Sequence, residues 1–294
     1  MRIKIDYTMT APVSHIGETA STGAYFNMIR FGADRLPVIT GNSIRGQIRD
    51  AGAAELLDRL GVQVDKEIFH VLFSGGNVSA TMKDDVGRAK SIREHFPLVS
   101  VLGGALGTMI MAGKLICGFA YPVCAETNAM LDARETVSWR ELIDEIEFTR
   151  TDDAKNDKLS GYVEDMDAET SGKASQQMRY AVQYMAPGTR FRQSLTLLPG
   201  TTDAEAGALL CAIARWWGTS PRLGGMSGKG FGLFDARLNL DGAEALAVKD
   251  GKLWTADEAR EKIEGYRAAS NESTLWLTLL KGVAKDGKKA NKPD

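Results

Sequence analysis

Hydrophobic and polar residues alternate from the start of the chain. Ile3, Ile5, Tyr7 and Met9 fall on one side of residues 2–9, and charged or hydroxyl side chains fall on the other. Because successive side chains of a strand point to opposite faces, this alternation predicts a strand with one buried face.

Two later stretches alternate in the same way and predict further strands. They are residues 190–197, whose polar face begins with arginines, and residues 235–240. Between them, Thr202 and Glu205 have the spacing of a capping box, so a helix is predicted to follow Thr202.

An earlier helix is predicted up to about residue 60, because Asn42 or Ser43 can cap its first turn and Gly61 can end its last. Residues 14–31 are small, polar and aromatic, and they indicate a long loop or an irregular hairpin. Short apolar pieces bounded by glycines predict strands joined by tight turns, at residues 71–76, 99–107 and 113–123.

Two polar segments fall outside this pattern. Residues 150–177 are poor in large apolar side chains, which predicts a mobile excursion from the fold, and residues 285–294 predict a disordered tail. The remaining order of strands and helices predicts an α+β fold with a mainly antiparallel, ferredoxin-like sheet.

The composition is that of an ordinary globular protein, with 44% hydrophobic and 25% charged residues among 294. No apolar run is long enough to cross a bilayer, and the N-terminus lacks the apolar core of a signal peptide, so no membrane partner is expected. The three cysteines have no metal-ligand spacing, and their odd number argues against a disulfide framework. A reduced, cytoplasmic setting is therefore expected.

The formal charge of −2 is unevenly distributed along the chain. Residues 19–49 contain a single acid, Asp34, and residues 170–202 and 206–234 contain none, although each window carries arginines. Buried strands and glycine loops would explain one such window. Three windows together favour a basic face and a polyanionic partner.

The first of these windows contains GNSIRGQIRDAG, in which Gly41 and Gly46 have the spacing of a phosphate-binding loop. A nucleotide-hydrolysing loop needs lysine and then serine or threonine after the second glycine, but Gln47 and Ile48 stand there. The start of a helix can still contact nucleic-acid phosphates. The candidate contacts are Asn42, Ser43, Arg45, Gln47 and Arg49, with the two arginines four residues apart on one helix face. A capped helix without a ligand is the alternative.

The third window contains a second glycine-rich run, RLGGMSGKGFGLF, at residues 222–234. Its glycines would let the backbone approach a ligand closely, and its basic residues would supply charge. A structural turn is an equally open alternative. The candidate RNA contacts here and in the second window are Arg179, Arg190, Arg192, Arg222, Gly224, Gly225, Lys229 and Gly230.

Residues that support catalysis are sparse. The three histidines lack metal-ligand spacing and no G-x-S-x-G motif is present, so neither a metal nor a cofactor is expected. His15 lies in an acid-poor, aromatic stretch where it could meet RNA. Tyr25, Phe26 and Phe31 nearby could stack on bases, although core packing is the alternative for them.

Several of these segments together resemble a known family. PVITGNSIRGQIRDAG resembles the strand-turn-helix near the N-terminus of the RAMP superfamily, whose members form the backbone of CRISPR effector complexes. MRYAVQYMAPGTRF and RLGGMSGKGFG resemble the later strand and the glycine-rich loop of that superfamily. LFSGG and VSVLGGALG resemble its central glycine turns, most of all those of the type IV version.

The resemblance implies one RRM-like domain over residues 1–294, a palm with a glycine-rich loop and with a thumb inserted at residues 148–182. It also implies a non-catalytic subunit that binds CRISPR guide RNA, polymerises along it and presents the spacer for pairing. The implied partners are the guide RNA, target DNA or RNA, copies of the chain in a helical filament, other effector subunits and a helicase.

Two enzymatic alternatives exist within the same superfamily. One is a metal-independent endoribonuclease that processes CRISPR RNA with His15 as general base. The other is a target-RNA nuclease like the type III relatives, which use an aspartate in the loop after the first strand. Residues 14–33 contain no aspartate, and Asp34 lies almost against the next predicted strand, so the non-catalytic role is preferred.

Overall fold

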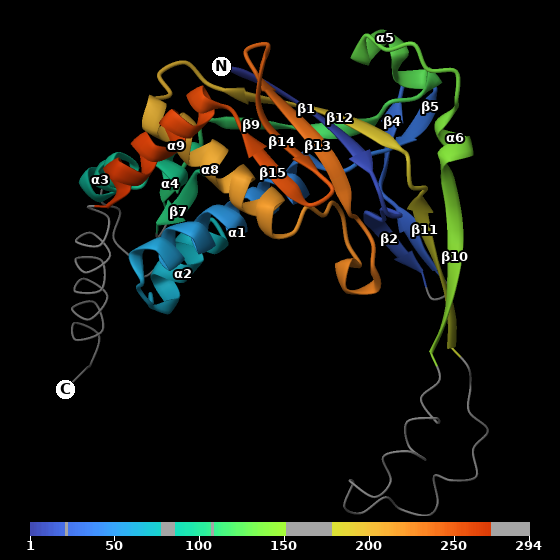
Figure 1. The fold of residues 1–294 in the computed structure, drawn as a ribbon. Coiled ribbons are helices and arrows are strands. Elements are labelled where there is room, and N and C mark those ends of the chain that lie inside the picture. The colour runs from blue at the N-terminus through green and yellow to red at the C-terminus, as the bar shows by residue number, and fades with distance from the viewer. Residues whose placement is uncertain (21–22, 78–85, 107–108, 151–177, 272–294) are drawn as a thin grey trace, which may run out of the picture.

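A computed structural model of the protein describes residues 1–20, 23–77, 86–106, 109–150 and 178–271. Its main sheet is antiparallel and has the strand order β15-β14-β13-β1-β12-β9 (Figure 1). The strands are β1 (Arg2–Met9), β9 (Leu115–Pro122), β12 (Arg190–Leu197), β13 (Phe234–Leu240), β14 (Ala243–Lys249) and β15 (Lys252–Thr255). The first strand of the chain therefore occupies the middle of the sheet, between β12 and β13.

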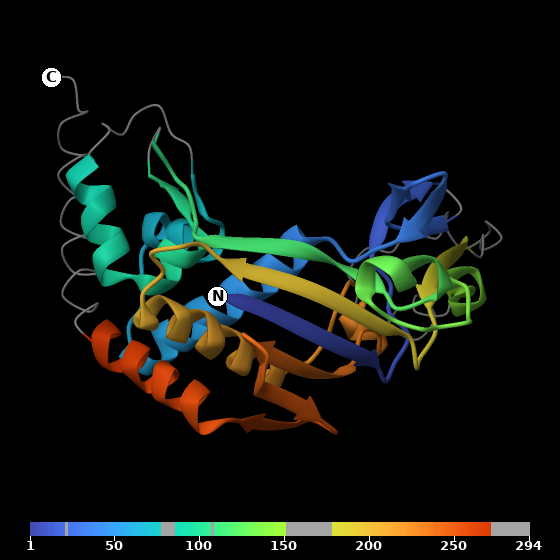
Figure 2. The same ribbon diagram turned by 90° about the horizontal axis from the view of Figure 1, so that it is seen from above.

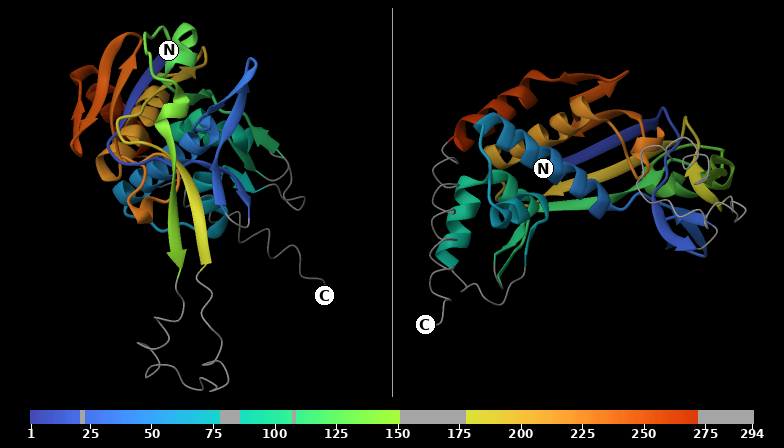
Figure 3. Two further views of the ribbon diagram at one scale, coloured as in Figure 1. Left: turned by 90° about the vertical axis from the view of Figure 1, so that its right-hand side faces the viewer. Right: turned by 90° about the horizontal axis from the view of Figure 1, so that it is seen from below.

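Helices cover one face of this sheet. They are α1 (Gly41–Leu60), α4 (Pro97–Leu102), α8 (Asp203–Thr219) and α9 (Asp257–Ser270). Seen from above, β1 and β12 lie in front of α1, and the view from below reverses that order (Figures 2 and 3). The apolar face of β1 packs with Ile44 of α1 and Trp217 of α8 in one core cluster, as its alternating sequence requires.

A second sheet of order β10-β11-β3-β2 projects from the body of the protein (Figure 3, left). Its strands are β2 (Ile16–Ala20), β3 (Gly23–Phe26), β10 (Ile143–Arg150) and β11 (Met178–Met185). The shorter elements are β4 (Met28–Phe31), β5 (Asp34–Pro37), β6 (Gly76–Asn77), β7 (Gly104–Leu106), β8 (Met109–Met111), α2 (Lys66–Phe73), α3 (Val86–His95), η1 (Ala125–Thr127), α5 (Asn128–Leu131), α6 (Trp139–Leu142) and η4 (Ser227–Lys229).

The predicted α+β class with antiparallel sheets is confirmed. The strands predicted at 2–9, 190–197 and 235–240 are β1, β12 and β13, and Thr202 caps α8 through the predicted capping box. Residues 14–31, where a loop or irregular hairpin was expected, form β2, β3 and β4.

The strands predicted at residues 71–76 and 99–107 are in large part wrong. Residues 71–73 end α2, residues 99–102 belong to α4, and only the short strands β6 and β7 follow them. A short apolar run that is buried on all sides has no periodicity that separates a helix from a strand. Pro97 at the first position of α4 is a helix-start signal, because its fixed φ suits the first helical turn.

Two predicted segments lie wholly or partly outside the described residues. The ends of the predicted thumb, 148–150 and 178–182, belong to the paired strands β10 and β11, while 151–177 and the predicted tail 285–294 are not described. Within the described ranges, no helix combines the length and hydropathy that a membrane span requires.

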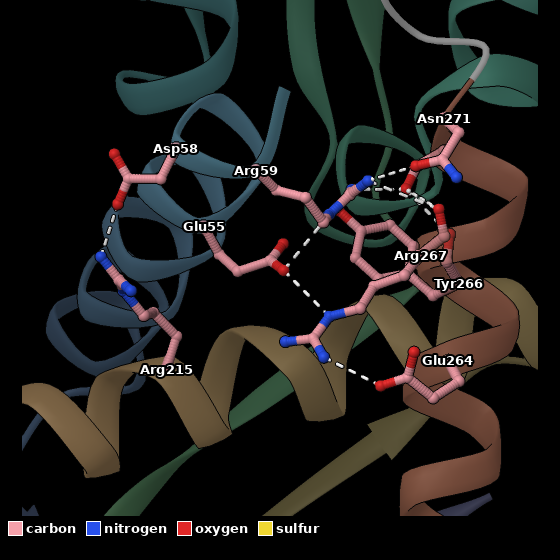
Figure 4. Close-up of polar contacts among 9 residues, drawn as sticks. Glu55, Asp58, Arg59, Arg215, Glu264, Tyr266, Arg267 and Asn271 are labelled. Carbon is pink, nitrogen blue, oxygen red and sulfur yellow. Dashed lines mark hydrogen bonds and ion pairs between the residues drawn. The ribbon is translucent and has the colours of Figure 1, made fainter. Parts of the chain in front are cut away.

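A buried carboxylate joins α1 to α9 (Figure 4). Glu55 is 7% exposed, and its Oε1 lies 3.3 Å from Arg59 Nε and 3.1 Å from Arg267 Nε. Arg267 also contacts the exposed Glu264 at 2.9 Å, and Arg59 donates a hydrogen bond to Ser270 Oγ at 2.6 Å. This end of the helix layer is therefore held by charged groups as well as by apolar packing.

Candidate nucleic-acid interface

The segment Val13–His15, which follows β1, brings the two predicted RNA-binding motifs together. We call it the junction loop. Ser14 O accepts a hydrogen bond from Gly225 N in the glycine-rich loop at 2.7 Å, and Ser14 Oγ donates to Gln183 O in β11 at 2.8 Å. His15 Nε2 accepts a hydrogen bond from Thr40 N, at the start of α1, at 3.2 Å. Segments far apart in the sequence thus meet at one place.

Gly224 makes this approach sterically feasible. Its φ of +73° lies in the left-handed region, and a Cβ built there would overlap the carbonyl oxygen of Ser14. The close approach predicted for this glycine therefore exists, and its partner is the junction loop of the same chain. Gly230 at +88° faces open space.

The first turn of α1 lies beside the junction loop. Thr40 caps the helix, and its Oγ1 accepts a hydrogen bond from Ser43 N at 3.4 Å. The predicted caps, Asn42 and Ser43, are thus two and three residues too late. The helix begins earlier because Gly41 fits directly against the backbone of Cys117 and Gly118 in β9, where a larger residue would overlap.

The side chains after this cap differ in their availability. Asn42 is exposed and Gln47 is half-buried, and neither side chain has a hydrogen-bond partner within the described part of the chain. Ser43 is half-buried beside the cap. The exposed amide of Asn42 therefore leaves this helix start open to a ligand.

Arg45 and Arg49 share one face of α1, as their spacing predicts, but this face points into the protein. Both guanidinium groups donate to the Leu102 carbonyl at the end of α4, and Arg49 also reaches Gly103 O at 3.0 Å. Arg49 is 9% exposed, and burial together with the neighbouring Arg45 lowers its pKa to about 10. These arginines cap the carboxyl end of α4, an arrangement that satisfies otherwise unpaired carbonyls.

His15 has a restricted chemical role in this arrangement. The Nε2 atom accepts the Thr40 N–H and lies 3.1 Å from Thr40 Oγ1, so this nitrogen is not free to take a proton from a ligand. Burial lowers the pKa of His15 below 6.5, which favours the neutral ring at neutral pH.

This shift predicts a pH dependence of stability. Unfolded His15 binds a proton more readily than folded His15, so the free energy of unfolding should fall as the pH drops through about 6.5. We expect the His15→Gln variant to lose less stability than the wild type between about pH 7.5 and about pH 5.5. Urea unfolding at both pH values measures this difference, and equal losses in the two proteins would contradict it.

Lys229 contacts the outer part of the β10–β11 strand pair. Its ammonium group lies 4.4 Å from the ring centre of Phe148 and 4.7 Å from that of Tyr180, and it donates a hydrogen bond to the Tyr180 hydroxyl. Arg179, one residue before Tyr180, is exposed. Neither cation has a carboxylate partner among the residues that the structure describes.

The other predicted basic contacts bond within the protein. Arg190 pairs with Glu135, and Arg192 pairs with Asp6 at 2.5 Å and donates to Leu131 O at 2.6 Å. Both lie on the face of β12 that is turned away from the helices. Arg222 donates a hydrogen bond to Phe231 O at 2.7 Å, which links the two ends of the glycine-rich loop. The structure therefore does not bring Arg190 and Arg192 to the junction loop.

Sequence reasoning missed three residues of this interface. Ser14, Thr40 and Gln183 make its connecting hydrogen bonds. Thr40 stands just before the predicted helix and could have been considered as its cap. Ser14 and Gln183 carry no sequence signal of their own, because their role depends on which segments meet.

Comparison with known proteins identifies the family of the chain. Residues 7–235 match the sequence profile of the RAMP superfamily, and the chain belongs to that superfamily. No curated protein sequence matches significantly. Among solved structures, a chain of a type IV-B CRISPR complex has a similar fold, with a TM-score of 0.58 and 19% identity. The similarity covers 81% of this chain and 90% of the other.

Proposed function

We propose that this protein is a non-catalytic backbone subunit of a CRISPR effector complex that binds guide RNA. Copies of the chain polymerise along the RNA and present the spacer for pairing with target DNA or RNA. Other effector subunits then assemble on this ribonucleoprotein. Membership of the RAMP superfamily and the fold similarity to a chain of a type IV-B CRISPR complex support the assembly role.

The observation that carries RNA binding is the meeting of both glycine motifs at the junction loop. Gly225 bonds to Ser14, and the α1 cap Thr40 bonds to His15, so an exposed helix start and a glycine backbone flank one short segment. The exposed start of a helix is suited to phosphate groups, and Lys229 of the glycine-rich loop supplies positive charge. The proposed contacts are His15, Asn42, Gln47, Arg179, Gly224, Gly225, Lys229 and Gly230.

The geometry gives less support to the enzymatic alternatives. A processing endoribonuclease would need His15 as a base, but its Nε2 already accepts the Thr40 N–H. A metal-dependent nuclease would need an aspartate after the first strand. Asp34 is held by Arg140 at 2.7 and 2.6 Å, and the Arg140 hydrogen bond lowers its pKa. We therefore propose a binding role rather than a cleaving one.

The salt dependence of RNA binding tests this proposal. Replacing both Arg179 and Lys229 with glutamine should reduce the slope of log affinity against log salt by roughly 1.4 on single-stranded RNA, because each phosphate contact contributes roughly 0.7. Arg237→Gln is the matched control, because this exposed arginine of β13 lies on the face of the main sheet that is turned away from the helices. Fluorescence anisotropy titrations at several salt concentrations measure the slope. A double variant with the wild-type slope would remove these residues from the interface.

A further inference from the structure

A cavity of about 650 Å³ opens beside the junction loop, between the projecting sheet and α6. Its lining includes Tyr25, Asn27, Arg35, Trp139 and Gln183. Two of these residues bond directly to the junction loop: Asn27 N donates to His15 O at 2.7 Å, and Gln183 O accepts from Ser14 Oγ at 2.8 Å. The cavity is therefore continuous with the proposed RNA interface.

Aromatic side chains form the walls of the cavity. Tyr25 is 39% exposed, whereas its neighbour Phe26 is 2% exposed and packs in the core. On the α6 side, the Arg140 guanidinium stands 4.8 Å from the Trp139 ring and is fixed by its ion pair with Asp34. An exposed phenol ring and a pre-formed cation-aromatic stack lining one cavity are suited to a flat ligand that binds by stacking.

The cavity also has polar groups that can bond to the base and the phosphate of a nucleotide. Gln183 Oε1 accepts from Phe26 N at 3.2 Å, which leaves its amide NH₂ free of any partner among the described residues, and the Asn27 amide is equally free there. The guanidinium of Arg35 donates to Met28 O at 3.4 Å and forms no ion pair within the described ranges, while its backbone N–H donates to Asp34 Oδ1 at 2.8 Å. Amides can bond to base edges, and an unpaired guanidinium can bond to a phosphate.

We propose that this cavity takes one unpaired base of the bound RNA, stacked on Tyr25, with an adjoining phosphate on Arg35. The inference rests on the proposed function and assigns a base site next to the backbone contacts at the junction loop. Stacking tolerates any base, so the site would hold RNA of varied sequence in a fixed register. The unpaired Arg35 favours this occupant over a side chain from a neighbouring copy.

Photo-crosslinking tests the base site. The probe is single-stranded RNA that carries 5-iodouridine, a base that crosslinks on irradiation to aromatic rings stacked on it. The RNA is bound to the full-length protein and irradiated. The crosslinked peptide is then identified by mass spectrometry. We expect the link at Tyr25, its loss in Tyr25→Ala and its retention in Tyr25→Phe. Tyr25→Ala should also weaken RNA binding by roughly 5- to 150-fold, the usual effect of removing one stacking ring.

Trp254→Ala is the matched control, because this aromatic residue is 49% exposed on the edge strand β15 of the other sheet. It should leave both affinity and crosslink unchanged. The base site would be overturned if the wild type binds RNA with the expected salt dependence but crosslinks at other residues, and if Tyr25→Ala binds with unaltered affinity. That outcome would leave the proposed function intact. A Tyr25→Ala variant that changes only the size of the RNA-free assembly would assign the cavity to a neighbouring copy and overturn the proposal. Failure of the wild type to bind RNA would refute the proposed function and the base site together.

Discussion

Replacing Glu55 with alanine is expected to lower the free energy of unfolding by about 3–5 kcal/mol. The carboxylate is buried between two arginines, and among the described residues its removal leaves Arg59 without a carboxylate partner and Arg267 with only the exposed Glu264 (Figure 4). The side chains of both arginines are partly covered, so water cannot fully replace the lost partner. Urea unfolding of wild type and variant measures the difference.

Glu264→Ala is the control for this prediction. Glu264 contacts the same Arg267 at 2.9 Å, but its side chain is 61% exposed, and such surface pairs contribute only about 0–1 kcal/mol. Equal losses in the two variants would mean that burial of Glu55 has no special importance for the α1–α9 contact.

The second large effect is expected at Gly224. An alanine there would be strained by the positive φ, which costs about 1–3 kcal/mol, and its methyl group would push Ser14 and the junction loop away. We expect RNA affinity to fall at least roughly tenfold, which corresponds to about 1.4 kcal/mol of binding free energy. Thermal unfolding and RNA titration of the same preparation separate the stability loss from the binding loss.

Gly228→Ala separates the junction contact from a general effect of changing the glycine-rich loop. Gly228 lies in the same loop, faces open space and has no left-handed φ. The free energy of unfolding of the Gly228→Ala variant should therefore stay within about 0.5 kcal/mol of the wild-type value. A folded Gly224→Ala protein that binds RNA as tightly as Gly228→Ala would show that the junction loop has no part in binding.

The sequence allowed the palm strands to be predicted because their burial is one-sided. The alternation of Ile3, Ile5 and Tyr7 can be seen without any partner, and the Thr202 capping box is a local signal. The elements in the middle of the chain were harder to predict. Val99 and Leu102 are buried on a short helix, and an apolar run of this length fits a strand equally well.

The candidate interface depends on contacts that the sequence does not contain. The two glycine motifs can be read from the sequence, but their meeting at the junction loop became visible only with the hydrogen bond from Gly225 to Ser14. The spacing of Arg45 and Arg49 placed both on one helix face. No local pattern indicated that this face contacts the carbonyl of Leu102, because the packing partner of a helix depends on the whole fold.

The central position of β1 also determines when the proposed RNA interface can first form during synthesis of the chain. This strand is synthesised before its partners β12 and β13, which extend to Leu240, and before Gly225, the partner of Ser14. At roughly 5–20 residues per second, tens of seconds of translation separate these segments. Until then the nascent chain carries an unpaired strand with an apolar face, which is open to pairing with a neighbouring nascent chain. Under the proposed function, a guide RNA therefore meets a complete binding surface only after residues up to Leu240 have been synthesised.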